Sequence, residues 1–115
     1  MELDKNLVSG SLPLLVLKLL EEREMYGYQM IKELQDRSDD SFRLKAGTLY
    51  PLLHSLEEKG FVTACERKSE TGRLQRCYRL TRQGGHALRE KETAWEQYAQ
   101  AVQKVLKGGK RHAEA

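Results

Sequence analysis

Features that would indicate a disulfide-stabilised or membrane protein are scarce in this chain of 115 residues. It has two cysteines, two prolines and one tryptophan, and aromatic side chains make up only 7% of it. Two cysteines suit free thiols in a reducing cytosol better than a disulfide framework. The longest apolar run, residues 12–20, is interrupted by Lys18 and is far shorter than the roughly 20 residues that a membrane span needs. We therefore expect a cytosolic protein with no signal peptide and no membrane span.

Residues that carry chemistry are equally sparse. The three histidines are scattered, and no cysteine or serine stands at motif spacing from a base. Cys65 and Cys77 lack the second pair of ligands that would complete a metal shell, and the glycine pairs form no phosphate-binding loop. The sequence therefore predicts no catalytic residues, no metal and no cofactor, and hence a protein that is not an enzyme.

Charge, in contrast, is plentiful and unevenly distributed. Residues 1–64 carry 8 basic and 11 acidic side chains, whereas residues 65–82 carry 6 basic and 2 acidic ones. Contact with a polyanion requires such a local concentration of positive charge. Chance clustering on a solvated surface is the alternative, and the helix that precedes the basic segment weighs against it.

A helix followed directly by a hairpin occupies the middle of the chain. Leucines recur at i, i+3, i+4 and i+7 from Leu49 to Leu56, which predicts a helix over about residues 47–59 with Pro51 in or near its first turn. Pairing the apolar faces of the two strands that follow sets Leu80 opposite Val62, so residues 70–72 form the turn. The hairpin then has a cationic tip, and helix and hairpin together have the layout of a winged-helix DNA reader.

The same register sets Cys65 opposite Cys77 on the face away from the core. A redox switch is one interpretation of this pair. Unlinked thiols are the other, and they are the expectation for a reducing cell.

The remaining elements follow from start and stop signals. Ser11 is predicted to cap a first helix with Pro13 in its opening turn, and a second helix is expected over about residues 27–38. Residues 42–44 alternate like a very short strand that would add to the wing. Thr81 is predicted to cap a last helix that ends at Lys107. We therefore divide the chain into a winged helix-turn-helix domain (1–83), a dimerisation helix (84–107) and a disordered tail (108–115).

The last helix carries an apolar stripe with a seven-residue repeat, which is typical of a dimerisation element. Packing on its own domain is the alternative, but a three-helix winged domain is complete without it. The predicted dimer contacts are Leu88, Trp95, Tyr98, Val102, Val105 and Leu106.

The predicted DNA contacts lie on the third helix and the wing. Positions opposite the leucine stripe carry short hydrogen-bonding groups suited to base edges or phosphates, and a cation before the helix helps its first N–H groups hold a phosphate. Arg73, beside the glycine of the turn, is expected to enter a minor groove. The full set of candidates is Lys45, Thr48, Tyr50, His54, Ser55, Lys68, Arg73, Gln75 and Arg76.

Trp95 stands on a helix whose other exposed-looking positions are mostly charged or amide residues, so its indole needs burial or a ligand. Two copies meeting in a dimer would form either a dry aromatic plug or, with Tyr98, a pocket for a small, planar, apolar effector.

Several runs of the sequence resemble the PadR family of bacterial transcriptional regulators, in its short form with a single C-terminal helix. The resemblance covers about residues 8–106 and is carried by residues 9–12, 26–28, 47–53, 56–62 and 78–84. In the wing, Gln75 replaces a cation of the family pattern and Cys77 replaces an aromatic residue. Trp95 matches a tryptophan that lines a pocket at the dimer centre of some multidrug-responsive relatives.

The resemblance implies a mainly α fold with a small β-hairpin wing and a long C-terminal helix. It also implies a homodimeric repressor that binds double-stranded DNA at a palindromic operator and is released by a small-molecule effector. The rival is a winged-helix protein–protein interaction module without DNA binding, which an exposed apolar patch on the third helix would favour. The polar residues Thr48, His54 and Ser55 argue against that rival.

Overall fold

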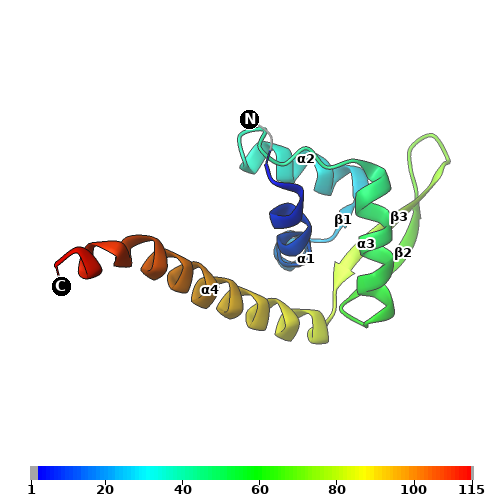
Figure 1. Cartoon of the computed structure of the whole chain (residues 1–115). Coiled ribbons are helices and arrows are strands. Elements are labelled where there is room, and N and C mark those ends of the chain that lie inside the picture. The colour runs from blue at the N-terminus through cyan, green and yellow to red at the C-terminus, as the bar shows by residue number, and fades with distance from the viewer. Residues whose placement is uncertain (1–2, 115) are drawn as a thin grey trace.

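The computed structural model describes residues 3–114, with side chains described for residues 3–108. Three helices and a small sheet form one body, and a long last helix leaves that body on the side away from the hairpin tip (Figure 1). This arrangement confirms the predicted fold class, a winged helix with a long C-terminal helix. The elements in chain order are α1 (Lys5–Glu22), β1 (Met25–Tyr26), α2 (Gly27–Arg37), α3 (Ala46–Glu58), β2 (Val62–Lys68), β3 (Leu74–Leu80) and α4 (Arg82–Glu114).

The core lies where α1, α2 and α3 meet one face of the sheet. Leu17 of α1, Met30 of α2 and Leu53 of α3 have no exposed surface at all.

Leu88 of α4 belongs to the same cluster and is also fully buried. The prediction that Leu88 lies at a dimer interface is therefore wrong. A seven-residue repeat identifies one face of a helix but not what covers it, and here the first turns of α4 pack on their own chain.

The sheet has the strand order β1-β3-β2, with both neighbouring pairs antiparallel. The predicted hairpin register is confirmed, since Val62 pairs with Leu80 and Cys65 pairs with Cys77. The N–H of Ser69 donates to the carbonyl oxygen of Arg73 at 2.8 Å, which closes a turn of residues 70–72. Gly72 has φ +82° in this turn, a conformation that a side chain disfavours.

The third strand comes from a segment that the sequence did not indicate. β1 lies directly before α2, where Met25 pairs with Tyr78 and is buried. The prediction of a strand at residues 42–44 is wrong. Phe42 and Leu44 are half-buried and pack against the core, so their alternation reflects packing and not strand pairing.

The start of α1 also differs from the prediction. Asp4, not Ser11, caps the helix, and its carboxylate accepts hydrogen bonds from the N–H groups of Asn6 and Leu7 at 2.8 and 3.3 Å. Pro13 therefore lies inside α1 and not in its opening turn.

Pro51 likewise falls in the second turn of α3, later than expected. A proline has no N–H to donate, so each costs its helix one backbone hydrogen bond, which the tertiary packing of α1 and α3 tolerates.

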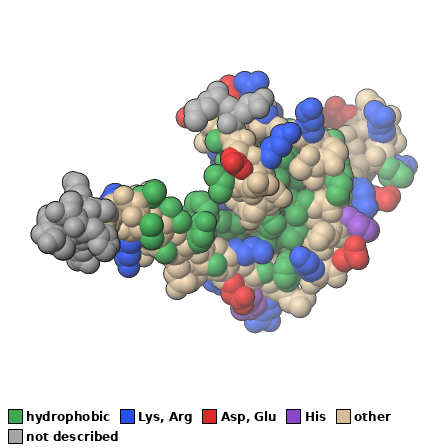
Figure 2. Space-filling view, viewed as in Figure 1, with side chains coloured by type: hydrophobic (Ala, Val, Ile, Leu, Met, Phe, Trp, Pro, Cys, Tyr) green, Lys and Arg blue, Asp and Glu red, His purple; other side chains and the backbone are tan. Residues whose placement is uncertain are grey.

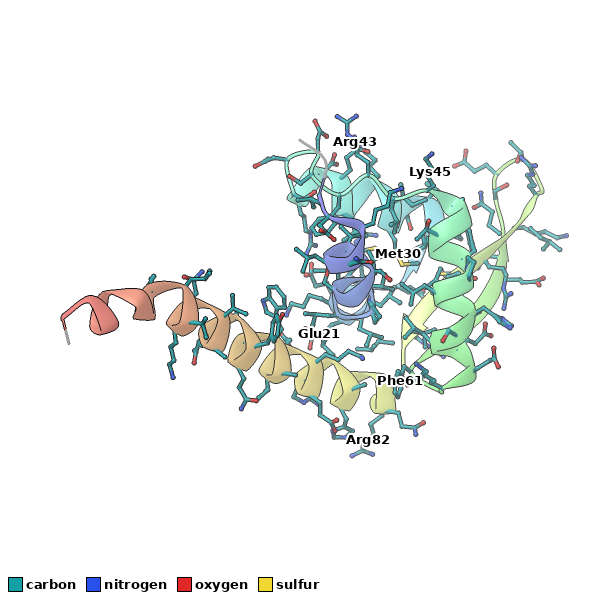
Figure 3. The ribbon with its side chains drawn as sticks, viewed as in Figure 1. Glu21, Met30, Arg43, Lys45, Phe61 and Arg82 are labelled. Atoms are coloured by element: carbon teal, nitrogen blue, oxygen red, sulfur yellow. The ribbon has the colours of Figure 1, made fainter. Side chains whose placement is uncertain are left out.

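The junction with α4 is built as the sequence predicted. The Thr81 hydroxyl accepts a hydrogen bond from the N–H of Gly84 at 3.0 Å and donates one to the carbonyl oxygen of Gly60 at 2.6 Å. Phe61 and Arg82 consequently lie close together where α4 begins (Figure 3). From there α4 continues to Glu114, past its predicted end at Lys107 and through most of the predicted tail. The last residue of that tail, Ala115, lies outside the described residues.

No helix in the described part of the chain is both long enough and apolar enough to cross a membrane.

Candidate nucleic-acid interface and ligand sites

The face of α3 that points away from the core is polar and small. Its leucines fill the core, so the opposite side presents Gly47, Thr48, Pro51 and His54 to solvent. The imidazole Nε2 of His54 lies 3.1 Å from a carboxylate oxygen of Glu58 one turn later. Ser55 is half-buried at the edge of this face. Side chains of this size allow the helix to approach a groove closely and offer donors and acceptors to base edges.

Cations stand before the first turn of α3. Lys45 is the residue before the helix, and Figure 3 shows it near the start of α3, with Arg43 further back along the loop that leads there. Both side chains are exposed. The first N–H groups of a helix have no partner within the helix, so a phosphate can bind there with help from a nearby cation. Lys45 was predicted as a DNA contact and Arg43 was not, although Arg43 precedes the same helix by three residues.

Two cations lie beside the turn at the tip of the wing. Lys68 and Arg73 are exposed on either side of the turn, and neither has an ion-pair partner among residues 3–108. The backbone N–H of Arg73 donates to the Ser69 hydroxyl at 3.2 Å, which fixes the turn next to it. Basic side chains are visible on the wing and along the loop before α3 (Figure 2). A duplex laid against α3 would therefore meet positive charge on both sides of the helix.

Two other wing arginines are engaged within the chain. Arg76 lies 3.3 Å from a carboxylate oxygen of Glu57 on α3 and 5.8 Å from the centre of the Tyr78 ring. Arg67 forms an ion pair with Glu24 in the turn before β1. Arg76 thus links the wing to α3, and the carboxylate of Glu57 already occupies one nitrogen of its guanidinium. Its neighbour Gln75 is half-buried.

Tyr50 contacts the start of α2 in a way that the sequence did not indicate. A Cβ placed on Gly27 would come within 2.2 Å of the Tyr50 hydroxyl, so the phenol occupies space that only glycine leaves open. Tyr26 and Tyr28 stack beside this point with ring centres 5.7 Å apart. Tyr28 is 57% exposed. The N-terminus of α2 is thus surrounded by phenol groups that can donate to phosphate oxygens.

The two thiols lie on the face of the sheet opposite the core. Both are free, Cys65 is exposed and Cys77 is buried. Burial raises the pKa of the Cys77 thiol, and the nearby carboxylate of Glu24 raises it further. The ligand atoms of Glu24, Cys65 and Cys77 all lie within 4.8 Å of one another. Sequence spacing could not reveal this group, because the glutamate comes from a turn about forty residues away.

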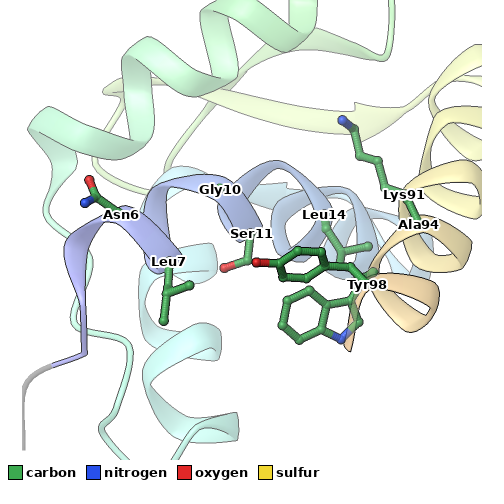
Figure 4. Close-up of a pocket in the computed structure, with 9 residues that line it drawn as sticks. Asn6, Leu7, Gly10, Ser11, Leu14, Lys91, Ala94 and Tyr98 are labelled. Carbon is green, nitrogen blue, oxygen red and sulfur yellow. The ribbon is translucent and has the colours of Figure 1, made fainter. Parts of the chain in front are cut away.

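The outer half of α4, taken as residues 95–108 because side chains are described as far as residue 108, exposes the rest of the predicted dimer stripe. Trp95 is 51% exposed and Val105 79% exposed, and Tyr98, Val102 and Leu106 are exposed as well. A hollow of about 320 Å³ lies between α1 and α4 at the base of this stripe. Figure 4 shows Leu7, Gly10 and Leu14 of α1 on one side of it and Ala94 and Tyr98 of α4 on the other. The predicted effector residues Trp95 and Tyr98 therefore both line one hollow.

Comparison with known proteins gives one consistent result. Residues 16–90 match the family model described as the transcriptional regulator PadR-like family. The transcriptional regulator Rv3488 of Mycobacterium tuberculosis is 38% identical over 81 residues, which cover 70% of this chain and 72% of that protein. A padr family transcriptional regulator from Eggerthella lenta has a similar structure, with a TM-score of 0.80, 34% identity and coverage of 89% of this chain and 87% of that one. A transcriptional regulator from Clostridium thermocellum gives a TM-score of 0.84 at 27% identity, covering 91% and 99% of the two chains.

Proposed function

Because this chain belongs to the PadR-like family of transcriptional regulators, whose members are not enzymes, we propose that it acts as a dimeric repressor on a palindromic operator. One α3 and one wing from each protomer contact each half-site. The observation that carries the DNA contact is the polar face of α3, with the exposed cations Lys45, Lys68 and Arg73 close to it in the loop before the helix and on the wing. We take the protein to act in the cytosol, where α3 and the wing would contact the duplex.

The proposed dimer rests on the apolar stripe of α4. Val105 and Leu106 are 79% and 72% exposed. A helix with this much unburied apolar surface is expected to pair with a second copy. A two-fold axis through the α4 pair relates the two α3 helices, so the operator should be an inverted repeat.

The DNA contact is tested by the salt dependence of binding. Arg73→Ala should weaken binding to all sequences alike, because a phosphate or minor-groove contact carries charge more than base identity. The slope of log affinity against log salt should fall by about two per dimer, roughly one for each wing. Fluorescence anisotropy across a salt series measures both effects.

The matched control is Lys104→Ala, which removes an exposed cation on the outer half of α4. Its slope should equal that of the unaltered protein. An unchanged slope in Arg73→Ala would show that the wing tip makes no electrostatic contact with DNA.

A small planar effector is the second part of the proposal, and the hollow beside Trp95 supports it. In a dimer the two hollows and the two indoles would lie near the α4 pair. A ligand held there would shift the α4 helices and with them the spacing of the two α3 helices, which lowers affinity for the operator. The alternative is a dry aromatic plug that only joins the protomers.

Trp95 is the only tryptophan, so its fluorescence reports on this place alone. Planar cationic dyes and drug-like compounds are titrated while quenching and operator affinity are followed together. Saturable quenching that also weakens operator binding supports the sensor. Absence of quenching across a diverse set, combined with a destabilised dimer in Trp95→Ala, identifies the residue as structural.

The rival function, a protein-interaction module without DNA binding, needs an apolar patch on α3. Within α3 the exposed residues are small or polar apart from Tyr50, which is 42% exposed and packs against Gly27. This composition favours a nucleic acid over a protein partner.

A further inference from the structure

Three potential metal ligands from three separate segments meet on the outer face of the sheet. Glu24 lies in the turn between α1 and β1, Cys65 on β2 and Cys77 on β3. The two cysteines are direct cross-strand partners. Their sulfur atoms and a carboxylate oxygen of Glu24 all lie within 4.8 Å of one another.

The group is closed on one side and open on the other. Cys77 is only 3% exposed, whereas Cys65 is exposed and the Glu24 side chain is 32% exposed. An ion would therefore enter past Cys65 and Glu24 and find Cys77 at the bottom of the site. A soft divalent cation favours thiolate ligands, and a binding site needs such an entry path.

The charges of the three ligands, a divalent ion and the neighbouring Arg67 also sum to zero. Two thiolates and one carboxylate carry three negative charges, so a bound divalent ion leaves one. The guanidinium of Arg67 already pairs with one oxygen of the Glu24 carboxylate. The second oxygen remains to bind the ion, and Arg67 then neutralises the remaining charge while orienting the carboxylate.

We propose that Glu24, Cys65 and Cys77 form a binding site for a thiophilic divalent cation, of which Zn²⁺ is the common biological example. Zinc binds sulfur at about 2.3 Å and oxygen at about 2.0–2.2 Å, which sets the ligand atoms of a tetrahedral site roughly 3.5–3.8 Å apart. Rotation of the two partly or fully exposed side chains closes the difference. Three protein ligands leave the fourth position to water, as in other open zinc sites.

An ion in this site would join the turn before β1 to both strands of the wing. Glu24 lies three residues before the first residue of α2, so the same bridge would tie the base of the wing to the start of that helix. The site needs only the fold and does not depend on the operator proposed above.

The test uses the full chain, kept reduced, with Cd²⁺ as the probe. Binding of cadmium to thiolates produces a charge-transfer absorption in the ultraviolet, and the titration should saturate at one ion per chain. Zn²⁺ should abolish the band by competition, and it should protect the exposed thiol of Cys65 from a disulfide reagent.

Variants locate the ligands. Cys77→Ser and Cys65→Ser should each lose tight binding, and Glu24→Gln should weaken it at least tenfold. Glu66→Gln is the matched control, because Glu66 is an exposed carboxylate next to Cys65 whose backbone position faces the other side of the sheet. Circular dichroism confirms that each variant is folded, and Cys65→Ser, at an exposed position, carries the test if Cys77→Ser unfolds.

The proposal is overturned if the reduced protein gives no charge-transfer band, or if Cys65→Ser binds cadmium as tightly as the unaltered chain. Equal weakening in Glu24→Gln and Glu66→Gln would also overturn it, since the effect would then be general surface charge. Oxidation to a Cys65–Cys77 disulfide with no metal binding to the reduced form would identify the pair as a redox couple instead.

Discussion

Large apolar side chains are mostly buried in the winged body, which α1, α2, α3 and the sheet form, whereas they are exposed on the outer half of α4. In the body, Leu17 and Leu53 have no exposed surface. On α4, Trp95 and Val102 follow Leu88 at intervals of seven residues, yet Leu88 is fully buried whereas Trp95 is 51% exposed. One uninterrupted repeat thus passes from an intrachain core to open solvent. A helical repeat therefore specifies a face of the helix, while the partner of that face changes along its length.

The two regions should therefore differ in what stabilises them. The body buries its core within one chain, so its stability should be independent of protein concentration. The outer half of α4 gains little tertiary packing within the chain, and helices without packing are marginal in water. Its order should depend on a second copy, and hence on concentration.

Leu88→Ala should have the largest effect on stability, although it lies on the same stripe as the predicted dimer contacts. Removing a fully buried leucine costs about 2–5 kcal/mol, because the cavity adds to the lost transfer energy. Urea unfolding at several protein concentrations should show a loss of this size at each of them. A loss that vanishes on dilution would mean that Leu88 acts at the dimer interface and not in the core.

Val105→Glu combined with Leu106→Glu should leave the body folded and separate the protomers. Burying a valine or leucine side chain is worth about 1.5–3 kcal/mol, so the dimer should weaken by roughly a hundredfold or more. Sedimentation velocity measures the dissociation. Lys104→Glu makes the same change in net charge at a position that points roughly opposite to the apolar stripe of the helix, and it should leave the dimer intact. A dimer unaffected by the double substitution would place the interface elsewhere.

Thr81→Ala should have the smallest effect of the three, at the point where the two regions join. It removes the cap from the Gly84 N–H and the donor to the Gly60 carbonyl. Loss of a helix cap costs about 0.5–2 kcal/mol. Thr81→Ser keeps both hydrogen bonds and should restore most of the stability in the same urea experiment. A full-sized loss in Thr81→Ser would assign the effect to the methyl group and not to the hydroxyl.

Patterns in the sequence predicted those parts of the fold that neighbouring residues determine. The leucine spacing indicated α3, the strand faces gave the hairpin register, and a threonine before a helix-friendly run indicated the cap at Thr81. Each of these follows from residues close together in the chain or from a two-residue period.

Features that depend on distant contacts were missed. From the sequence alone, Gly84 is only a residue that weakens the first turns of a helix. In the fold a Cβ at this position would come within 2.0 Å of the Phe61 carbonyl oxygen, so the close approach of the two segments requires glycine. The pairing of Met25 with Tyr78 and the approach of Glu24 to the cysteines likewise join segments far apart in the chain. No local pattern encodes such contacts, because tertiary packing alone brings the segments together.

The candidate DNA surface shows the same division. The sequence indicated which residues of α3 point away from the core, since helical spacing determines this. It could not show that Arg76 is held by Glu57 whereas Arg73 has no ion-pair partner among residues 3–108, since that difference depends on which acidic side chain lies nearby.

If two copies of this chain bind DNA together through α3 and the wing, the DNA that they prefer should carry two related half-sites. Duplexes selected from a random pool with the unaltered protein, and then sequenced, reveal that preference. We expect an inverted repeat whose half-sites are centred about one helical turn, roughly 10–10.5 base pairs, or a multiple of it apart. Enrichment of a single unrepeated site, or no enriched sequence at all, would contradict this expectation.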